Sequence, residues 1–283
     1  MRTSRRRSEL SVLRPPVAAG PQGGHALLDA AAGVLAFAVM SDSGLEHFRG
    51  SYKNRAMFVA PTISAATLAA ACGLLGGGRV RRGVFAAAVA AGLIGTGFHV
   101  YNIAKREGGF RWLNLFYGAP LGAPGTIAMA GLYGLAAEPW EGSGLVAQAI
   151  RRLRRGPLLA WSAVVGLIGT IAEVGLFHYR GNFQNPFMYA PVTLPPLATG
   201  ALAAATLWPA TQVRRLAGLL LGLTGAAGVA GMAFHAYGVQ RCMGGWANWR
   251  QNAIDGPPLP APLGFLGMAL AGLAALARME PAG

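Results

Sequence analysis

Eight apolar stretches alternate with polar segments along the chain, and each is close to the length that crosses a membrane. They cover residues 26–45, 60–77, 83–103, 119–137, 157–177, 190–208, 216–236 and 261–277. About 20 apolar residues in a helix cross a hydrocarbon core of about 30 Å. Because lipid offers no hydrogen bonds, such stretches must satisfy their own backbone groups as helices. The pattern therefore predicts an all-α membrane protein with eight transmembrane helices.

Two polar segments that follow the first and fifth stretches resemble each other. Residues 42–50 read DSGLEHFRG and residues 173–181 read EVGLFHYRG. The match extends to Asn54 and Asn185 in the loops that follow. Composition alone can repeat apolar residues, whereas a recurring order of acid, His, aromatic, Arg and Asn indicates a duplicated site.

A second pair of segments repeats at a similar separation. FHVY at residues 98–101 corresponds to FHAY at 234–237, and AP at 123–124 corresponds to AP at 261–262. These matches predict a tandem duplication of a four-helix unit. Units with an even number of spans keep one orientation, so the repeats would be parallel, related by a pseudo-two-fold axis along the membrane normal. The predicted divisions are a basic tail (1–25), a first four-helix unit (26–140), a basic link (141–156), a second four-helix unit (157–277) and a short tail (278–283).

Composition supports the membrane assignment, and charge sets the orientation. The chain is 53% hydrophobic, only 12% charged and has a net charge of +14. In a soluble protein this charge would favour nucleic acid, but here 15 of the 24 Lys and Arg fall on one side of the eight-span arrangement. The positive-inside rule then places both termini in the cytoplasm and the repeated motif outside. The Ala-, Gly- and Arg-rich composition is typical of a GC-rich bacterium, so we expect a multi-pass protein of the inner membrane, with the lipid bilayer and no nucleic acid as partner.

The acids of the motif are the first candidates for catalytic chemistry. Asp42 and Glu173 each precede a His by five residues, which on a helix places the acid about 7.5 Å deeper than the His. An ionisable group within lipid is costly and is a functional candidate by default. Proton transfer is the catalytic role expected here, and the alternative is that each acid pairs with an Arg and fixes helix packing.

Four of the five histidines occupy the outer ends of the odd-numbered spans: His47, His99, His178 and His235. Imidazole binds metals and haem iron, so all four are candidate ligands of haem b. Symmetry favours pairing His47 with His178 and His99 with His235. Their position at the membrane boundary argues against a buried haem, and the absence of CxxCH excludes c-type haem. Two alternatives stay open: the histidines tie the outer loops together, or they transfer protons at a quinone or substrate site.

Other polar residues of the motif are candidate cofactor contacts. Arg49 and Arg180 follow two residues after a His and would bind haem propionates through their planar guanidinium groups. Asn54 and Asn185 complete the predicted cofactor-binding set. His25, at the cytoplasmic edge of the first span, has no counterpart, and we expect it to be incidental.

These features favour a membrane subunit of a periplasmic-face oxidoreductase, which anchors a soluble partner and exchanges electrons with quinone, with or without haem b. Its expected partners are a periplasmic or another membrane subunit. One alternative is a small-solute or metal transporter, although a translocation path needs polar residues at several depths. The other is a non-catalytic membrane anchor or assembly protein, in which the motif only fastens loops. The residues do not decide whether the chain is an enzyme.

Overall fold

The computed structural model describes residues 21–140 and 143–279, which contain helices and no strand. Most of the predicted tail 1–25, part of the link and residues 280–283 lie outside the described residues. The first half contains α1 (Pro21–Arg49), η1 (Arg55–Phe58), α2 (Val59–Ala71), α3 (Gly78–Ala104), α4 (Trp112–Phe116) and α5 (Gly122–Ala137). After the linking helix α6 (Leu145–Leu153), the second half contains α7 (Gly156–Arg180), η2 (Pro186–Tyr189), α8 (Ala190–Leu207), α9 (Thr211–Arg241), η3 (Gly245–Asn248), α10 (Trp249–Asp255) and α11 (Leu263–Arg278).

Five helical segments are long and apolar enough to cross a membrane: α1, α3, α7, η2 with α8, and α9. The fold is therefore that of an all-helical, multi-pass membrane protein in its coarse features. Each predicted stretch corresponds to a helix, but α2, α5 and α11 have only 13, 16 and 16 residues. The predicted end of the second stretch at residue 77 is wrong. Helix α2 stops at Ala71, because Gly73 and Gly77 adopt positive φ angles of 72° and 73° that a helix cannot accommodate.

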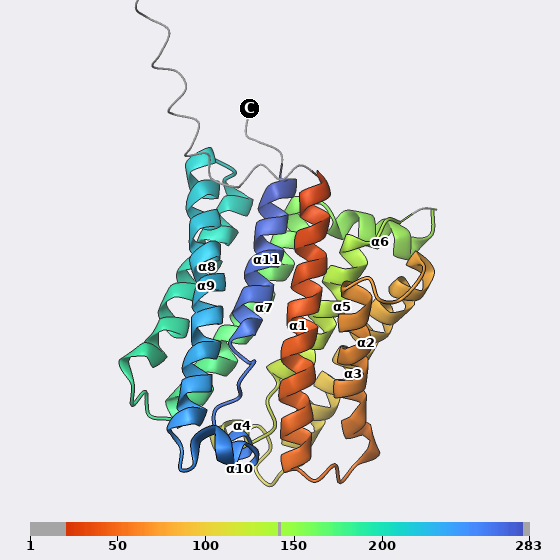
Figure 1. Ribbon diagram of the computed structural model, residues 1–283. Coiled ribbons are helices and arrows are strands. Elements are labelled where there is room, and N and C mark those ends of the chain that lie inside the picture. Colours follow the sequence, from red (N-terminus) through yellow and green to blue (C-terminus); the bar gives the residue numbers. More distant parts are fainter. Residues whose placement is uncertain (1–20, 141–142, 280–283) are drawn as a thin grey trace, which may run out of the picture.

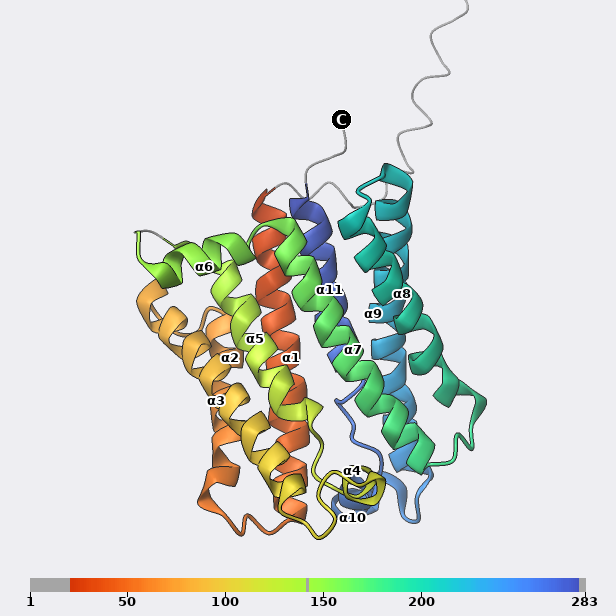
Figure 2. The same cartoon turned by 180° about the vertical axis from the view of Figure 1, so that it is seen from behind.

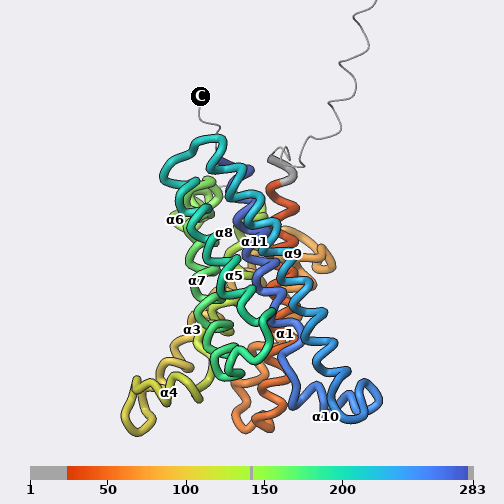
Figure 3. The backbone as a smooth tube through the Cα atoms, turned by 90° about the vertical axis from the view of Figure 1, so that its left-hand side faces the viewer, coloured from red at the N-terminus to blue at the C-terminus, as the bar shows by residue number. Residues whose placement is uncertain are grey.

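The helices of the two halves follow the same order and pack in the same pattern. Helix α5 packs against α1 and α3, and α11 packs against α7 and α9. The halves meet where α1 runs along α11 and where α5 contacts α7, so these four helices form the centre of the bundle (Figures 1 and 2). The hairpins α2–α3 and α8–α9 lie on opposite sides of this centre. Helices α4 and α10 lie at the end remote from α6, on opposite edges of the molecule (Figure 3).

Glycines allow the closest helix approaches in each half. A Cβ atom at Gly92 of α3 would lie 2.6 Å from the Pro124 carbonyl oxygen of α5. A Cβ atom at Gly228 of α9 would lie 2.7 Å from the Pro262 carbonyl oxygen at the start of α11. These separations are shorter than real Cβ contacts, so the backbones can meet only where no side chain intervenes.

A polar cluster joins the helix ends near α6. The Arg81 guanidinium lies 2.9 Å from Asp29 Oδ1 and 3.0 Å from Glu138 Oε1. It thereby links the start of α3 to α1 and to the residue that ends α5. Burial raises the pKa of the Glu138 carboxyl, and the charge of Arg81 opposes this rise. Asp29 on α1 is thus an ion-pair partner in this cluster.

His25 belongs to the same region and is not incidental, contrary to the prediction. Its Nδ1 lies 2.8 Å from the Ala137 carbonyl oxygen, and its Nε2 lies 3.1 Å from Arg154 Nη2. A neutral ring with the proton on Nδ1 donates to the first group and accepts from the second. His25 thus connects α1 to the end of α5 and to the segment between α6 and α7. The sequence pattern missed it because both partners are distant along the chain.

Candidate functional site

The four motif histidines share one geometry at the end of the bundle remote from α6. Each Nδ1 faces a backbone carbonyl oxygen in the segment that follows its helix: His47 faces Met57 at 2.5 Å, His99 faces Pro120 at 2.5 Å, His178 faces Met188 at 2.7 Å and His235 faces Pro258 at 2.6 Å. A carbonyl oxygen can only accept, so Nδ1 carries the proton in a neutral ring. Each histidine therefore ties down a loop and keeps the lone pair on Nε2.

Two of the histidines have an electrostatic neighbour in the same half of the chain. His99 lies within electrostatic range of His47, and His235 lies within that of His178. Helix α5 packs against both α1 and α3, and α11 packs against both α7 and α9. The pairs that symmetry favoured, His47 with His178 and His99 with His235, stay a prediction.

The turns that follow His47 and His178 have matching backbones. Ser51 and Tyr52 adopt φ angles of 57° and 45°, and Asn182 and Phe183 adopt 55° and 44°. In both turns the second of these residues places an aromatic ring over a ring six residues later. The ring centroids are 4.1 Å apart for Tyr52 on Phe58 and 4.6 Å apart for Phe183 on Tyr189.

Asn54 and Asn185 begin the short 3-10 helices after these turns. The Asn54 side-chain oxygen accepts from the Ala56 N–H at 2.9 Å, and that of Asn185 accepts from the Phe187 N–H at 3.0 Å. Such capping is a common use of Asn at a helix start. Both residues are exposed, so this local role already explains their presence without a bound cofactor.

Arg49 and Arg180 reach across to the other half. Arg49 Nη2 lies 3.1 Å from the Gly256 carbonyl oxygen and 3.4 Å from that of Ala253, at the end of α10. Arg180 Nη2 lies 3.4 Å from the Leu115 carbonyl oxygen in α4. Cations at helix C-termini are favourable because carbonyl groups there lack partners. Each arginine thus fastens a short outer helix of the opposite half, while its buried Nε has no hydrogen-bond partner among the described residues.

The two acids lie on corresponding helices of the two halves. Asp42 on α1 and Glu173 on α7 are both partly buried, and they lie within electrostatic range of each other. The Glu173 carboxylate lies against the start of α5, since a Cβ atom at Gly122 would overlap Glu173 Oε2; its buried Oε1 has no hydrogen-bond partner among the described residues. The sequence reasoning identified the two acids but did not anticipate that they come from different halves into one neighbourhood.

Two further residues at the end remote from α6 escaped the sequence reasoning. Asn114 Nδ2 donates to the Glu107 and Gly109 carbonyl oxygens at 2.9 and 2.8 Å. Asn252 Nδ2 donates to the Met243 and Gly245 carbonyl oxygens at 3.1 and 2.7 Å. Asn114 and Asn252 are 138 residues apart, whereas the FHVY and FHAY segments before them are 136 residues apart. The AP pairs at residues 123–124 and 261–262 are also 138 residues apart, so the sequence contained the information needed to align the two asparagines.

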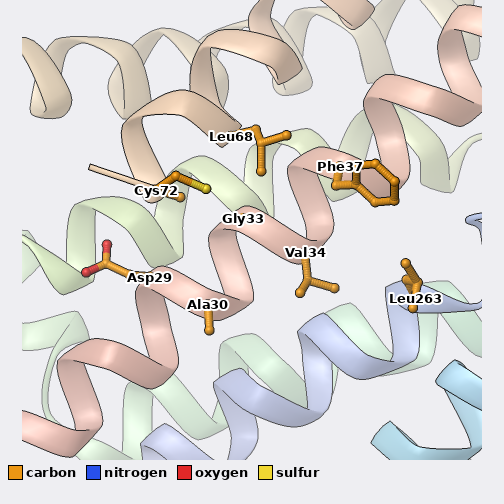
Figure 4. Close-up of a pocket in the computed structure, with 9 residues that line it drawn as sticks. Asp29, Ala30, Gly33, Val34, Phe37, Leu68, Cys72 and Leu263 are labelled. Atoms are coloured by element: carbon orange, nitrogen blue, oxygen red, sulfur yellow. The ribbon is translucent and has the colours of Figure 1, made fainter. Parts of the chain in front are cut away.

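No group of three or more His, Cys, Asp or Glu suited to a metal ion occurs within residues 21–140 and 143–279. A groove of about 330 Å³ runs between α1 and α2, lined by Gly33, Phe37, Leu68 and other apolar residues, with Asp29 at one end (Figure 4). It contains none of the repeated polar residues, so the candidate site remains the end of the bundle remote from α6. Comparison with protein-family models, curated proteins and solved structures found no match.

Proposed function

We propose that the chain is an eight-span inner-membrane protein that arose by tandem duplication of a four-helix unit, with both termini in the cytoplasm. The four His–carbonyl contacts, the two matching left-handed turns and the reciprocal contacts of Arg49 and Arg180 support the duplication. In this arrangement α2, α5 and α11 span with the help of the 3-10 helices and loops that precede them. The Arg-rich ends near α6 are the cytoplasmic side.

The function that the site supports best is that of a membrane subunit of an outer-face oxidoreductase, which exchanges electrons and protons with quinone. The observation that carries this proposal is that Asp42 and Glu173 are partly buried acids on the first helices of the two halves, within electrostatic range of each other. Reduction of a quinone takes up protons together with electrons. Carboxyl groups and neutral imidazoles are the side chains that most often transfer such protons, and an intramembrane acid is a functional candidate by default.

The histidines have the chemistry that a haem b would require. Metal-bound histidine usually donates its second ring N–H to a carbonyl or carboxylate, and all four rings donate Nδ1–H to a carbonyl oxygen. His47 with His99, or His178 with His235, would hold the iron, and the haem would carry single electrons. Arg49 and Arg180 already contact backbone carbonyl groups, so propionate binding would have to share them.

One observation favours a second candidate, a non-catalytic anchor or assembly protein. The histidines, Arg49, Arg180, Asn54 and Asn185 each make a hydrogen bond that fastens an outer loop. A rigid outer surface suits a docking platform as well as a redox site. The acids separate the two candidates, because a platform has no need of a partly buried carboxyl group in each half.

The test measures quinone binding and chromophore content on the purified, full-length protein in mild detergent. A short-chain ubiquinone analogue is titrated against intrinsic tryptophan fluorescence, and oxidised and dithionite-reduced visible spectra are recorded. We expect saturable binding that weakens at least tenfold in an Asp42→Asn/Glu173→Gln double variant, and unchanged binding in the control Glu107→Gln, an acid in an outer loop. Absence of saturable binding by the wild type, or equal binding by the double variant, refutes the quinone site and favours the anchor.

A further inference from the structure

Helix α6 runs across the ends of the bundle helices instead of along them (Figures 1 and 2). It contacts α5 and α7, the two helices that it connects. Only Arg154 and Arg155 separate its last residue from the first residue of α7, so α6 is held at the level where α7 begins. Because α7 is long and apolar enough to cross a membrane, this is the level at which a bilayer surface is expected.

The segment before α6 is fastened at the same end of the bundle. Arg82 of α3 donates from Nη1 to the Pro139 carbonyl oxygen at 2.8 Å, and its guanidinium lies 5.4 Å from the ring centroid of Trp140. Trp140 Nε1 in turn donates to the Leu135 carbonyl oxygen at 2.9 Å. Tryptophan is enriched where a membrane meets water, so Trp140 supports the same level for this part of the chain.

The side chains of α6 fall into three groups around its axis. With about 3.6 residues per turn, residues three or four apart share a face of a helix. The buried group consists of Ala147 and Ile150. The exposed apolar group, called here the apolar face, consists of Leu145, Val146 and Ala149. The exposed polar group consists of Gln148, Arg151 and Arg152.

The apolar face is large and open. Leu145 is 85% exposed and Val146 is 65% exposed, although the chain around them is rich in arginine. Contact of such side chains with water is unfavourable, and a helix surrounded by water would carry polar residues at these positions. Acyl chains remove this cost, and they are present on the side of a helix that lies in the plane of a membrane surface.

Arginines accompany the apolar face. Arg152 is exposed in the last turn of α6, and Arg155 is exposed directly before α7. Within residues 21–140 and 143–279 neither guanidinium takes part in an ion pair or a side-chain hydrogen bond. A guanidinium group binds phosphate through paired N–H donors, and basic residues on an amphipathic helix attract anionic lipid headgroups.

We propose that α6 is an in-plane interfacial helix whose apolar face lies among acyl chains, while Arg152 and Arg155 bind the phosphate groups of anionic phospholipids in the same leaflet. This arrangement accounts for all three groups of side chains, because they face protein, acyl chains and headgroups respectively. The inference goes beyond the proposed function and is independent of quinone. It needs only that α7 crosses the membrane.

The depth of α6 is measured with nitroxide spin labels on the full-length protein in phospholipid nanodiscs. Cys72 and Cys242, both exposed, are replaced with serine, and one new cysteine is introduced as Leu145→Cys or, for the polar side, as Gln148→Cys. Molecular oxygen concentrates among acyl chains, whereas a neutral nickel chelate stays in water. We expect the label at residue 145 to respond more to oxygen and the label at residue 148 more to the chelate. Val146→Cys provides a second reading of the apolar face.

Two results would overturn the depth assignment. Equal response of the labels at residues 145 and 148 to the nickel chelate would place α6 in water. Protection of the label at residue 145 from both reagents would show that protein, such as a second copy of the chain, covers the apolar face.

Headgroup binding is measured by native mass spectrometry of protein released from nanodiscs with equal amounts of phosphatidylcholine and phosphatidylglycerol. We expect the wild type to retain phosphatidylglycerol in excess, and the excess to fall by at least about threefold in Arg152→Gln/Arg155→Gln. The control Arg106→Gln/Arg111→Gln removes the same charge from exposed residues at the end remote from α6 and should leave it unchanged. An unchanged excess in the first variant, or an equal fall in both, refutes the proposed lipid contact. Loss of quinone binding alone would leave this inference standing, and either refutation would leave the proposed function untouched.

Discussion

Replacing Gly92 with alanine should separate α3 from α5 and so disturb the position of His99. Glycine in a helix interior normally costs up to about 1 kcal/mol relative to alanine. Where a new Cβ atom meets no neighbour, replacing glycine with alanine would therefore stabilise the folded protein. At Gly92 the new Cβ would lie 2.6 Å from the Pro124 carbonyl oxygen and would overlap Ala128. Because these neighbours are largely backbone, the helices must move, and overpacking of this kind typically costs about 1–3 kcal/mol.

Gly97→Ala provides the matched control on the same helix. Gly97 is exposed and a Cβ there has no neighbour within 4 Å, so we expect unchanged or slightly increased stability. The difference in unfolding free energy between the two variants should therefore be about 2–4 kcal/mol, the sum of the two effects. Reversible unfolding in mixed detergent micelles, followed by circular dichroism, measures it. Equal stabilities would refute the inferred close approach of α3 and α5.

Three other substitutions test contacts at the two ends of the bundle. Asn252→Ala removes two hydrogen bonds to backbone carbonyl groups and should lower the unfolding free energy by about 1–3 kcal/mol, measured in the same assay. His235→Ala leaves the Pro258 carbonyl oxygen without its donor, and we expect a loss of about 1–2 kcal/mol, largely recovered in His235→Gln if the amide reaches the same oxygen. Burial raises the pKa of Glu138, so the folded state binds its proton more tightly than the unfolded chain. Its contribution is therefore most favourable at low pH and declines as pH rises above about 4.3, and Glu138→Gln should flatten the dependence of melting temperature on pH in that range.

The sequence predicted the helices well because apolar runs are a local property. Helix ends were less predictable: α3 and α9 extend beyond the apolar stretches 83–103 and 216–236, since backbone hydrogen bonds continue through the polar residues that flank them. The segment 60–77 was misjudged because Leu74 and Leu75 prolong the apolar run, although Gly73 and Gly77 with their positive φ angles end the helix.

The candidate site was less predictable in its contacts than in its local geometry. The repeated order of polar residues predicted similar surroundings for His47 and His178, and the turns that follow them do have matching backbones. It did not reveal that Arg49 and Arg180 contact the opposite half, nor that Glu173 lies against Gly122 at the start of α5. Those contacts join residues far apart in sequence, and they depend on how the two halves pack rather than on any local pattern.

The left-handed turns after His47 and His178 carry an energetic consequence. A residue other than glycine in this conformation costs about 1–2 kcal/mol, and Ser51 and Tyr52 adopt it consecutively. The ring of Tyr52 returns about 0.5–1.5 kcal/mol through its stack on Phe58. Tyr52→Ala would lose the stack and keep the strain, whereas Tyr52→Gly would lose both. In thermal unfolding, Tyr52→Gly should therefore lower the melting temperature less than Tyr52→Ala, which is the reverse of the order found within a helix. The aromatic ring of Tyr52 thus compensates for a backbone conformation that only glycine adopts freely.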